Sequence, residues 1–503
     1  MLIEFIRYIF KEGVSVFCII KYMDLVTILK TVVAAPVIGC FFIPIAAKIS
    51  VSARNAYAVA LGLLTFAAAA IMLPFMINGV TATYSVSFPM GFDFVLSADL
   101  LSVFMASISS FVSAVILIYS VDYISHYENQ TEYYVMVVLF LGSMMGLVFS
   151  ANLLWMYVFW EMTGFASWRL VGFFRSDRDV AKANKTILVT IFGALCMLVG
   201  ILIIYFDRGT MDLRLLHGEP IGMAAASLIL IGILAKSATL PFSTWLPDAG
   251  VAPSTVTSLL HAAVLVKIGV YAYARIFGAT FIVDPVFSQA VLLIAGASAL
   301  VAAGAALIEK DIKRIIAYST VSQIGFIFLG LASGNKTAFA GALLYILMHS
   351  IAKGGLFLCA GIIEQNTHTK DITKMGGLAK TMPLTALSFA LCSLSVMGIP
   401  PFGGFFSKFL VFKGAAQNGS VLVLMMFLAG AMMTLLYLVR LFYMVFLGED
   451  KATNPREGSV VMVASVMALA LIGLALGAFI YYPSSYVNML TAQLSVGLSN
   501  TIQ

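Results

Sequence analysis

The sequence predicts an all-α polytopic membrane protein with about fourteen transmembrane helices, of which the seventh and the twelfth are broken. Of the 503 residues, 61% are hydrophobic and only 10% are charged, and the mean hydropathy is +1.03. A soluble domain carries about 45–50% apolar and about 25% charged residues. No water-soluble core can bury an apolar excess of this size, so the composition excludes a soluble enzyme.

Apolar runs recur along the whole chain, and each is long enough to cross a bilayer, which takes about 20 residues. Almost nothing is left over for a domain outside the membrane. The runs predict spans at residues 25–47, 56–78, 99–120, 132–150, 152–174, 180–206, 222–247, 253–277, 285–308, 312–333, 337–364, 384–417, 420–447 and 459–481.

Two segments depart from this pattern. Residues 80–97 alternate polar and apolar side chains, which predicts a short hairpin lying over one membrane face. Residues 1–24 carry charged side chains, among them Glu4 and Lys11, inside an otherwise apolar run. They predict an N-terminal interfacial segment, with Met23 as an alternative start.

Lysine and arginine are unevenly divided between the loops on the two sides of the predicted bundle. Cytoplasmic loops carry the basic excess in membrane proteins. We therefore expect a multi-pass protein of the cell's inner (plasma) membrane, with the richer side cytoplasmic and both ends of the helix bundle outside. The richer side has 14 such residues, namely Lys48, Arg54, Arg175, Arg178, Lys182, Lys185, Lys310, Lys313, Arg314, Lys370, Lys374, Lys380, Lys451 and Arg456, and the other side has 5, namely Arg208, Arg214, Arg275, Lys336 and Lys413.

The sequence shows no cofactor or metal motif. The net charge of +6 is modest, and no basic stretch is long enough to bind nucleic acid. The five cysteines are scattered without a CxxC pair, which argues against an iron–sulfur or zinc site. Neither a Walker sequence nor a Rossmann glycine signature occurs in a strand–turn–helix setting. We therefore expect no catalytic redox site on this chain.

Two spans contain proline at mid-membrane. The seventh reads AKSATLPFSTWLPDA around Pro241, and the twelfth reads SVMGIPPFGGFFSKFLVF around Pro400 and Pro401. Proline removes a backbone donor, so each helix must open there. Because the breaks lie five spans apart, they indicate two inverted five-helix units, a pattern typical of transporters. Two unrelated proline kinks are the alternative.

Several ionisable side chains fall deep inside predicted spans, where each costs several kcal/mol and is a functional candidate. One acid and four lysines in this set, two of the lysines beside broken helices, indicate a proton relay. The alternatives are that Lys353 and Lys408 reach the headgroups, that His349 is a hydrogen-bonded core residue, and that Glu161 and Lys236 form a structural ion pair. The candidates are Glu161, Lys236, His261, Lys267, His349, Lys353 and Lys408.

Five motifs occur in the order found in one known family. They are FWEMTGFASWRLVGFF, AKSATLPFSTWLPDAGVAPSTVTSLLHAAVLVKIGVYAYAR, EKDIKRIIAYSTVSQIGFIFLG, MHSIAKGGLFLCAG and MGIPPFGGFFSKF. Over roughly residues 95–447 the chain resembles the antiporter-like proton-channel subunits of respiratory complex I. The same family includes the large subunits of Mrp-type cation/proton antiporters and of membrane-bound hydrogenases.

The resemblance implies two inverted repeats, helices 4–8 in residues 132–277 and helices 9–13 in residues 285–447. Peripheral helices 1–3 would occupy residues 25–131, and helix 14 with a C-terminal tail would occupy residues 459–503.

The resemblance also implies roles for single residues. Glu161 corresponds to the family's fifth-helix glutamate, which pairs with the seventh-helix lysine, here Lys236. Lys267 corresponds to the central lysine of helix 8 and His261 to the histidine before it. Lys408 resembles the exit residue of helix 12, and His349 and Lys353 match the motif of helix 11. Arg169, eight residues after Glu161, departs from the aliphatic residue commonly found there.

The expected function is that of an ion-translocating subunit, most simply for protons, in a redox-driven complex related to complex I. Its expected partners are other antiporter-like and small membrane subunits and peripheral redox subunits. One alternative is a Mrp-type Na⁺/H⁺ antiporter subunit without a redox partner, toward which Lys408 and the sequence LVKIGVYA point. The other is a membrane scaffold whose charges only hold helices together.

Overall fold

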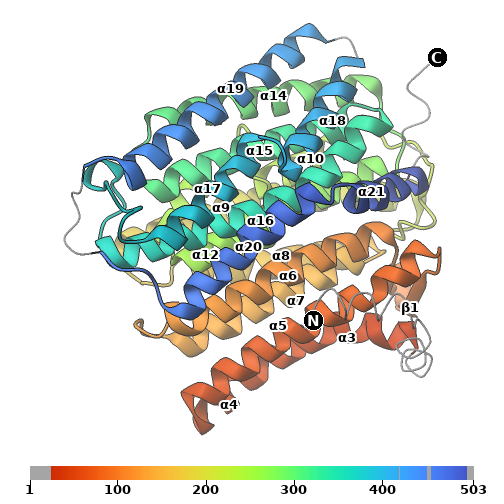
Figure 1. The fold of residues 1–503 in the computed structure, drawn as a ribbon. Helices are drawn as coiled ribbons and strands as arrows, with labels where there is room; N and C mark the ends of the chain where they lie inside the picture. Colours follow the sequence, from red (N-terminus) through yellow and green to blue (C-terminus); the bar gives the residue numbers. More distant parts are fainter. Residues whose placement is uncertain (1–23, 418–419, 450–454, 495–503) are drawn as a thin grey trace.

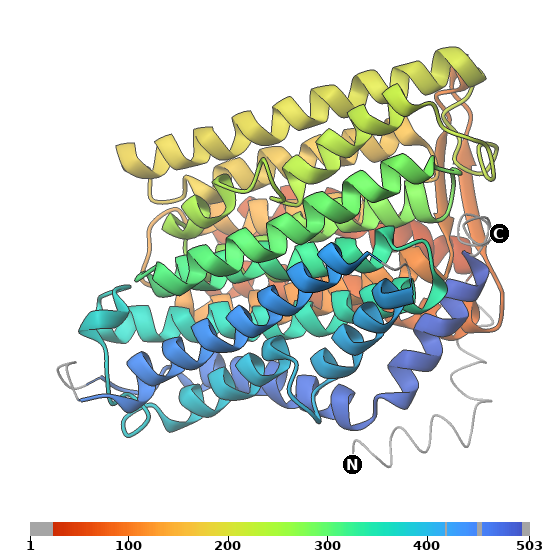
Figure 2. The ribbon, with the colours of Figure 1, turned by 90° about the horizontal axis from the view of Figure 1, so that it is seen from above.

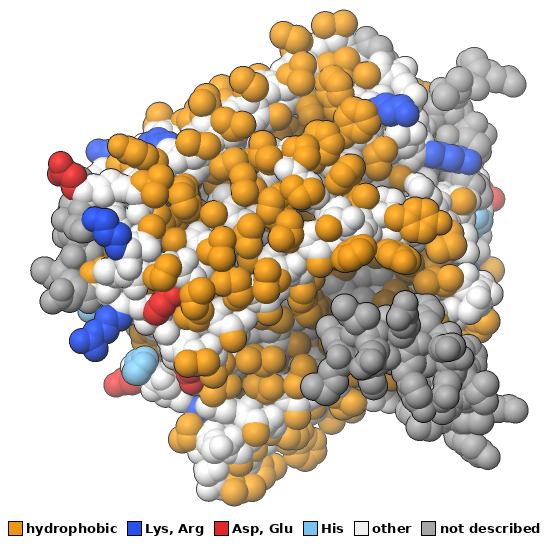
Figure 3. All heavy atoms as spheres, viewed as in Figure 1, with side chains coloured by type: hydrophobic (Ala, Val, Ile, Leu, Met, Phe, Trp, Pro, Cys, Tyr) orange, Lys and Arg blue, Asp and Glu red, His pale blue; other side chains and the backbone are white. Residues whose placement is uncertain are grey.

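The protein is a bundle of long helices lying side by side, as seen in a computed structural model that describes residues 24–417, 420–449 and 455–494 (Figures 1 and 2). Within these residues, 11 helices are long and apolar enough to cross a membrane. On the side of the bundle seen in Figure 3, hydrophobic side chains cover the middle, and charged side chains gather toward the two ends. The predicted N-terminal interfacial segment, residues 1–24, lies almost wholly outside the described residues.

The first three spans lie together at one edge of the bundle (Figure 1). A two-stranded antiparallel hairpin joins the second span to the third, with Ala82 opposite Ala98, and it confirms the predicted hairpin. The end of the bundle that carries this hairpin is called the hairpin face below, and the opposite end is called the loop face. The elements are α3 (Leu25–Gly39), η1 (Cys40–Phe42), α4 (Ile43–Ile49), α5 (Val51–Ile77), β1 (Ala82–Val86), the short turn η2 (Pro89–Gly91), β2 (Phe94–Ala98) and α6 (Leu100–Tyr123).

The next five spans run from residue 130 to residue 278. The last of them, the eighth span, is not a uniform α-helix, because two π-helical segments interrupt it. The elements are α7 (Gln130–Phe149), α8 (Leu153–Val171), α9 (Asp177–Arg208), α10 (Met223–Lys236), α11 (Trp245–Asp248), η3 (Ala249–Val251), α12 (Ser254–Ser258), the π-segment η4 (Leu259–Ala263), α13 (Leu265–Tyr273) and the π-segment η5 (Ala274–Gly278).

The remaining spans run from residue 285 to residue 478, and a shorter helix follows them. The elements are α14 (Pro285–Ile308), α15 (Ile312–Ala332), α16 (Lys336–Thr367), η6 (Ile372–Lys374), α17 (Pro383–Met397), α18 (Gly403–Gln417), α19 (Val421–Phe442), the π-segment η7 (Tyr443–Leu447), α20 (Val460–Ala478) and α21 (Tyr481–Gln493).

Both predicted helix breaks are confirmed. The seventh span opens between the end of α10 at Lys236 and the start of α11 at Trp245. The twelfth opens between α17, which ends at Met397, and α18, which starts at Gly403. Gly398 follows α17 with a φ of 83°, a left-handed conformation that glycine adopts without steric cost.

Helix α21 is a difference from the sequence prediction, which treats its residues as a tail. It is a short helix whose buried residues are Val487, Leu490 and Thr491, too few to form a hydropathy peak. The hydroxyl of Tyr486 donates to the carbonyl of Leu100 at 2.9 Å, and its ring stacks on Phe104. These contacts hold α21 against the start of α6.

The broken seventh span and the eighth span approach each other closely at Gly269. A side chain there would overlap the Ser237 hydroxyl and approach the carbonyl oxygen of Ile233 to 2.7 Å. Ser237 directly follows Lys236, so this contact fixes the end of α10 against the middle of α13.

Replacing Gly269 with valine is therefore expected to force α10 and α13 apart and to destabilise the folded chain. Overpacking of a close contact costs about 1–3 kcal/mol. The melting temperature of the detergent-purified protein measures the effect. The matched control is Gly304→Val, because a side chain at Gly304 meets no atom within 4 Å. Equal melting temperatures for the two variants would contradict the prediction.

Candidate functional site

Lys236, the last residue of α10, is buried beside the fifth span. Its ammonium donates to the carbonyl of Trp160 at 3.0 Å and lies 5.4 Å from the centre of the Trp160 ring. Gly164 separates it from Glu161, since a Cβ at Gly164 would lie 3.4 Å from the Lys236 Nζ and 3.8 Å from the Glu161 Oε2. The acid and the base therefore face one small gap between α8 and α10.

The structural ion-pair alternative for Glu161 and Lys236 does not match this arrangement. Among the residues that the structure describes, the ion pairs within 4 Å do not include these two. Instead, the Glu161 Oε1 atom is buried without a hydrogen-bond partner. The carboxylate and the ammonium act on each other through space, so a proton moving onto or off either group changes the field at the other.

His261 lies in the π-segment η4 and is fully buried. Its ring packs on Phe357 with centroids 4.4 Å apart, and neither ring nitrogen has a hydrogen-bond partner within the described part of the chain. A buried imidazole without partners loses the hydrogen bonds it would make to water, so it is costly unless it has a use. π-segments are frequent at functional sites.

Lys267 makes its closest polar contact across the helix packing rather than along its own helix. Its Nζ atom lies 2.5 Å from the Nδ1 atom of His349 on α16 and 3.5 Å from the carbonyl oxygen of His261. Two basic nitrogens this close must hold one proton between them, because two lone pairs or two N–H groups would repel. The eighth and eleventh spans are thereby joined by a shared proton.

Lys353, one helical turn after His349, begins a polar network in the second half of the bundle. Its ammonium donates to the Ser319 hydroxyl at 2.7 Å and to a carbonyl of α15 at 3.1 Å. The Tyr437 hydroxyl donates to Ser319, the Gln323 amide donates to Tyr437, and the Tyr345 hydroxyl donates to Gln323. Three helices, α15, α16 and α19, meet around this network.

Lys408, in α18 just after the second break, completes the set. Its ammonium donates to the carbonyl of Val396 at 2.6 Å and lies 5.4 Å from the centre of the Tyr345 ring. Tyr345 thus lies between Lys408 and the network that reaches Lys353. The alternative in which Lys353 and Lys408 extend to the headgroups is wrong, because their exposed fractions are 0% and 7%.

Sequence reasoning missed the residues that link these lysines, namely Ser319, Gln323, Tyr345 and Tyr437. The one available signal was Gln323, a polar amide in the middle of an apolar span. The departure at Arg169 also has a local explanation. Its guanidinium pairs with Glu132 of α7, which a second arginine, Arg175, contacts at 2.5 Å.

Charged groups also surround a cavity of about 720 Å³ at the loop face. Asp248, at the end of α11, pairs with Lys185 at 2.8 Å, with Lys182 at 3.0 Å and with Arg314 at 2.9 Å. The cavity therefore borders the broken seventh span and the starts of α9 and α15. Water in it reaches the loop-face end of the break.

The fold and these groups define a class of protein: a multi-span membrane protein of the antiporter-like type, with two discontinuous helices and buried lysines between them. The sequence model of the NADH:quinone oxidoreductase/Mrp antiporter transmembrane family matches residues 150–434. That of the complex I chain 5 N-terminus matches residues 84–134. The chain belongs to the NADH:quinone oxidoreductase/Mrp antiporter family.

Two curated relatives represent the two branches of the family. The chain is 35% identical over 428 residues to the L subunit of NADH-quinone oxidoreductase from Escherichia coli, covering 83% of this chain and 69% of the relative. It is 33% identical over 434 residues to the large Na⁺/H⁺ antiporter protein of Alkalihalophilus pseudofirmus, covering 78% of this chain and 53% of the relative. The chain thus spans about half the length of that antiporter protein.

Solved structures share the fold over nearly the whole chain. One chain of the Mrp complex from Dietzia sp. superposes with a TM-score of 0.87 at 24% identity, covering 94% of this chain and 98% of that one. One chain of respiratory complex I from Thermus thermophilus gives 0.81 at 22% identity, covering 93% and 99%. These likenesses confirm the predicted fold class.

Proposed function

We propose that this chain translocates protons across the membrane as one component of a larger membrane complex. One observation carries the proposal: the buried lysines Lys236, Lys267, Lys353 and Lys408 lie in an otherwise apolar interior, each on a specific polar partner. Such groups are costly in a membrane and serve ion pathways by default. The two helix breaks beside Lys236 and Lys408 support this function, as do the inverted repeats that the sequence predicts in residues 132–277 and 285–447.

The proposed route begins at the cavity by Asp248, on the side that the lysine and arginine count makes cytoplasmic. A proton passes to Lys236, then to His261 and the Lys267–His349 pair, and leaves by way of Lys408. Each transfer joins neutral and protonated forms of basic side chains, and Glu161 sets the field at the first of them.

The driving force in this proposal comes from peripheral redox subunits, which are partners together with other antiporter-like membrane subunits. The likeness to the L subunit of Escherichia coli NADH-quinone oxidoreductase supports a redox-driven complex. Charge shifts that arrive from the neighbouring protein of the complex alter the field at Glu161 and thereby load or discharge Lys236.

Na⁺/H⁺ antiport without a redox partner is the second candidate. It is favoured by the likeness to the Na⁺/H⁺ antiporter protein of Alkalihalophilus pseudofirmus and by a lysine rather than a glutamate at position 408. The buried lysine chain would carry the proton half of the exchange in this case as well.

Purifying the chain with its native partners and reconstituting the complex in liposomes tests both candidates. With a pH-sensitive dye inside, the redox-driven hypothesis expects acidification when electron donor and acceptor are supplied, with no need for Na⁺. The antiport hypothesis expects an imposed pH gradient to collapse on addition of Na⁺ and not of choline. A complex that moves protons in neither assay contradicts the proposed function.

A further inference from the structure

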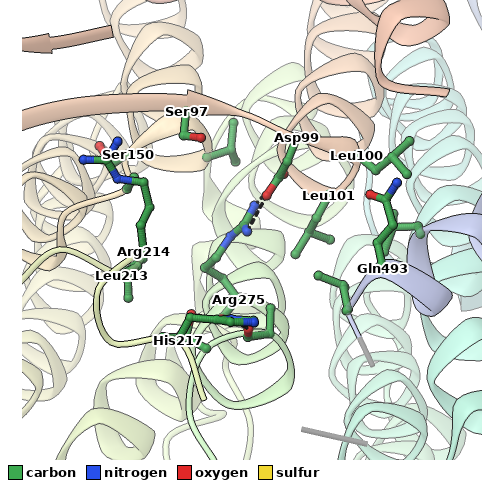
Figure 4. Close-up of a pocket in the computed structure, with 16 residues that line it drawn as sticks. Ser97, Asp99, Leu100, Leu101, Ser150, Leu213, Arg214, His217, Arg275 and Gln493 are labelled. Atoms are coloured by element: carbon green, nitrogen blue, oxygen red, sulfur yellow. Dashed lines mark hydrogen bonds and ion pairs between the residues drawn. The ribbon is translucent and has the colours of Figure 1, made fainter. Parts of the chain in front are cut away.

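A cavity of about 280 Å³ opens at the hairpin face, away from Lys408 and the second break (Figure 4). Residues from the start of α6, the end of α7, the loop after α9, the end of the eighth span and α21 line it. Asp99, Arg214, His217 and Gln493 give it a polar wall. The route proposed above does not use this cavity.

An ion pair lies in the wall of this cavity. Arg275, in the π-segment η5, donates two hydrogen bonds to the Asp99 carboxylate, at 2.6 and 2.7 Å (Figure 4). The arginine side chain is 14% exposed and the aspartate side chain is 30% exposed, so the pair meets the cavity on one side only. Burial alone would raise the pKa of Asp99, but the charge of Arg275 and hydrogen bonds from Arg275 and Ser102 hold it below its ordinary value.

Behind the ion pair, Tyr271 occupies the path toward the membrane centre. The Arg275 Nε donates to the Tyr271 oxygen at 3.1 Å, and the Tyr271 hydroxyl donates to the carbonyl of Val148 at 2.5 Å. Val148 and Arg275 both line the cavity, whereas Tyr271 is fully buried. The tyrosine is thus one layer of atoms away from the cavity.

Lys267 lies one helical turn further in. Lys267 and Tyr271 are four residues apart in α13, so they share a helix face, separated by about 6 Å along the axis. The eighth span therefore presents Lys267, Tyr271 and Arg275 in series, from the proton that Lys267 shares with His349 to the cavity at the hairpin face.

We propose that this series is a second proton route, leading from Lys267 to the hairpin face, and that the Asp99–Arg275 ion pair closes it. The inference rests on the proposed function, because it takes Lys267 to be a proton carrier. In the closed state, the Tyr271 oxygen accepts from Arg275 and its only proton is donated to Val148, so no proton passes.

When Arg275 swings away from Asp99, the route opens. The Lys267 ammonium loses a proton, which travels through the Tyr271 hydroxyl and water to the Asp99 carboxylate. Lys267 becomes neutral and Asp99 becomes a neutral acid, which then releases the proton to water in the cavity. The charge of Arg275 in the closed state repels a cation approaching from either side, so the pair acts as a barrier as well as a fastening.

Passive proton leak through the reconstituted complex tests the inference. Liposomes holding the complex receive a pH gradient with K⁺ and valinomycin to balance charge, and no redox substrate or Na⁺ is present. Arg275→Gln is expected to raise the leak per assembled complex at least several-fold over the unmodified complex. Adding Tyr271→Phe to Arg275→Gln is expected to return the leak to baseline, because the phenyl ring cannot relay a proton.

The matched control is Arg208→Gln, which breaks an exposed ion pair with Glu219 near the hairpin face, 2.9 Å long, and is expected to leave the leak unchanged. An unchanged leak in Arg275→Gln overturns the inference, as does a raised leak that Tyr271→Phe does not reverse. Poor assembly with a normal leak per assembled complex also overturns it, because the pair is then only a fastening. The leak assay needs no driven transport, so these failures are distinct from failure of the proposed function, which the driven assay reports.

Discussion

Replacing Lys236 with methionine is expected to reduce driven proton translocation by the assembled complex to the level of protein-free liposomes. The lysine is 1% exposed, and its ammonium donates to the carbonyl of Trp160. Methionine fills much of the same volume but cannot carry a proton, so the step between the loop-face cavity and the centre of the bundle loses its carrier. Proton uptake after addition of the driving substrates measures the loss, with the redox or Na⁺ reaction followed in parallel.

Glu161→Gln extends the same test to the acid across the gap. The amide keeps the shape of the side chain but removes its charge, so the field that favours a protonated Lys236 disappears. We expect a loss comparable to that of Lys236→Met. Lys336→Met, an exposed lysine at the start of α16, is the control and is expected to translocate normally. Normal translocation by either Lys236→Met or Glu161→Gln would refute the proposed route.

The positions of the spans were predictable because each depends on a local property of the chain. A run of apolar residues predicts a helix wherever it occurs, and the prolines after Lys236 and before Lys408 predict the two breaks. The hairpin followed from simple alternation. In all of these cases the signal lies within one segment, and the structure agrees with it. Helix α21 was missed because only a few of its residues are apolar and buried.

The partners of the site residues were not predictable in the same way. The sequence identified Lys267 and His261 as neighbours on one helix, whereas the structure pairs Lys267 with His349, 82 residues away. That contact depends on how α13 packs against α16, which no single span encodes. The hydroxyl and amide groups around Lys353 were missed for the same reason: each is an ordinary polar residue until three helices bring them together.

The Lys267–His349 pair provides a test that separates a proton relay from a scaffold. Lys267→Met and His349→Gln are each expected to abolish driven translocation with assembly retained. Glutamine can still hydrogen-bond to the Lys267 ammonium, but it cannot take up and release a proton. The transport defect of His349→Gln therefore isolates proton transfer from the structural hydrogen bond. Driven proton uptake is measured per assembled complex, with assembly measured by size-exclusion chromatography.

The double variant sharpens the distinction. If the two residues serve one transfer step, Lys267→Met/His349→Gln is expected to be no worse than either single variant, since groups that act as a unit are strongly non-additive. A scaffold gives the opposite result, because lost contacts between α13 and α16 lower assembly and leave translocation per assembled complex unchanged. The 2.5 Å contact makes the relay outcome the expected one: a purely structural contact between these helices would need no second titratable group facing Lys267.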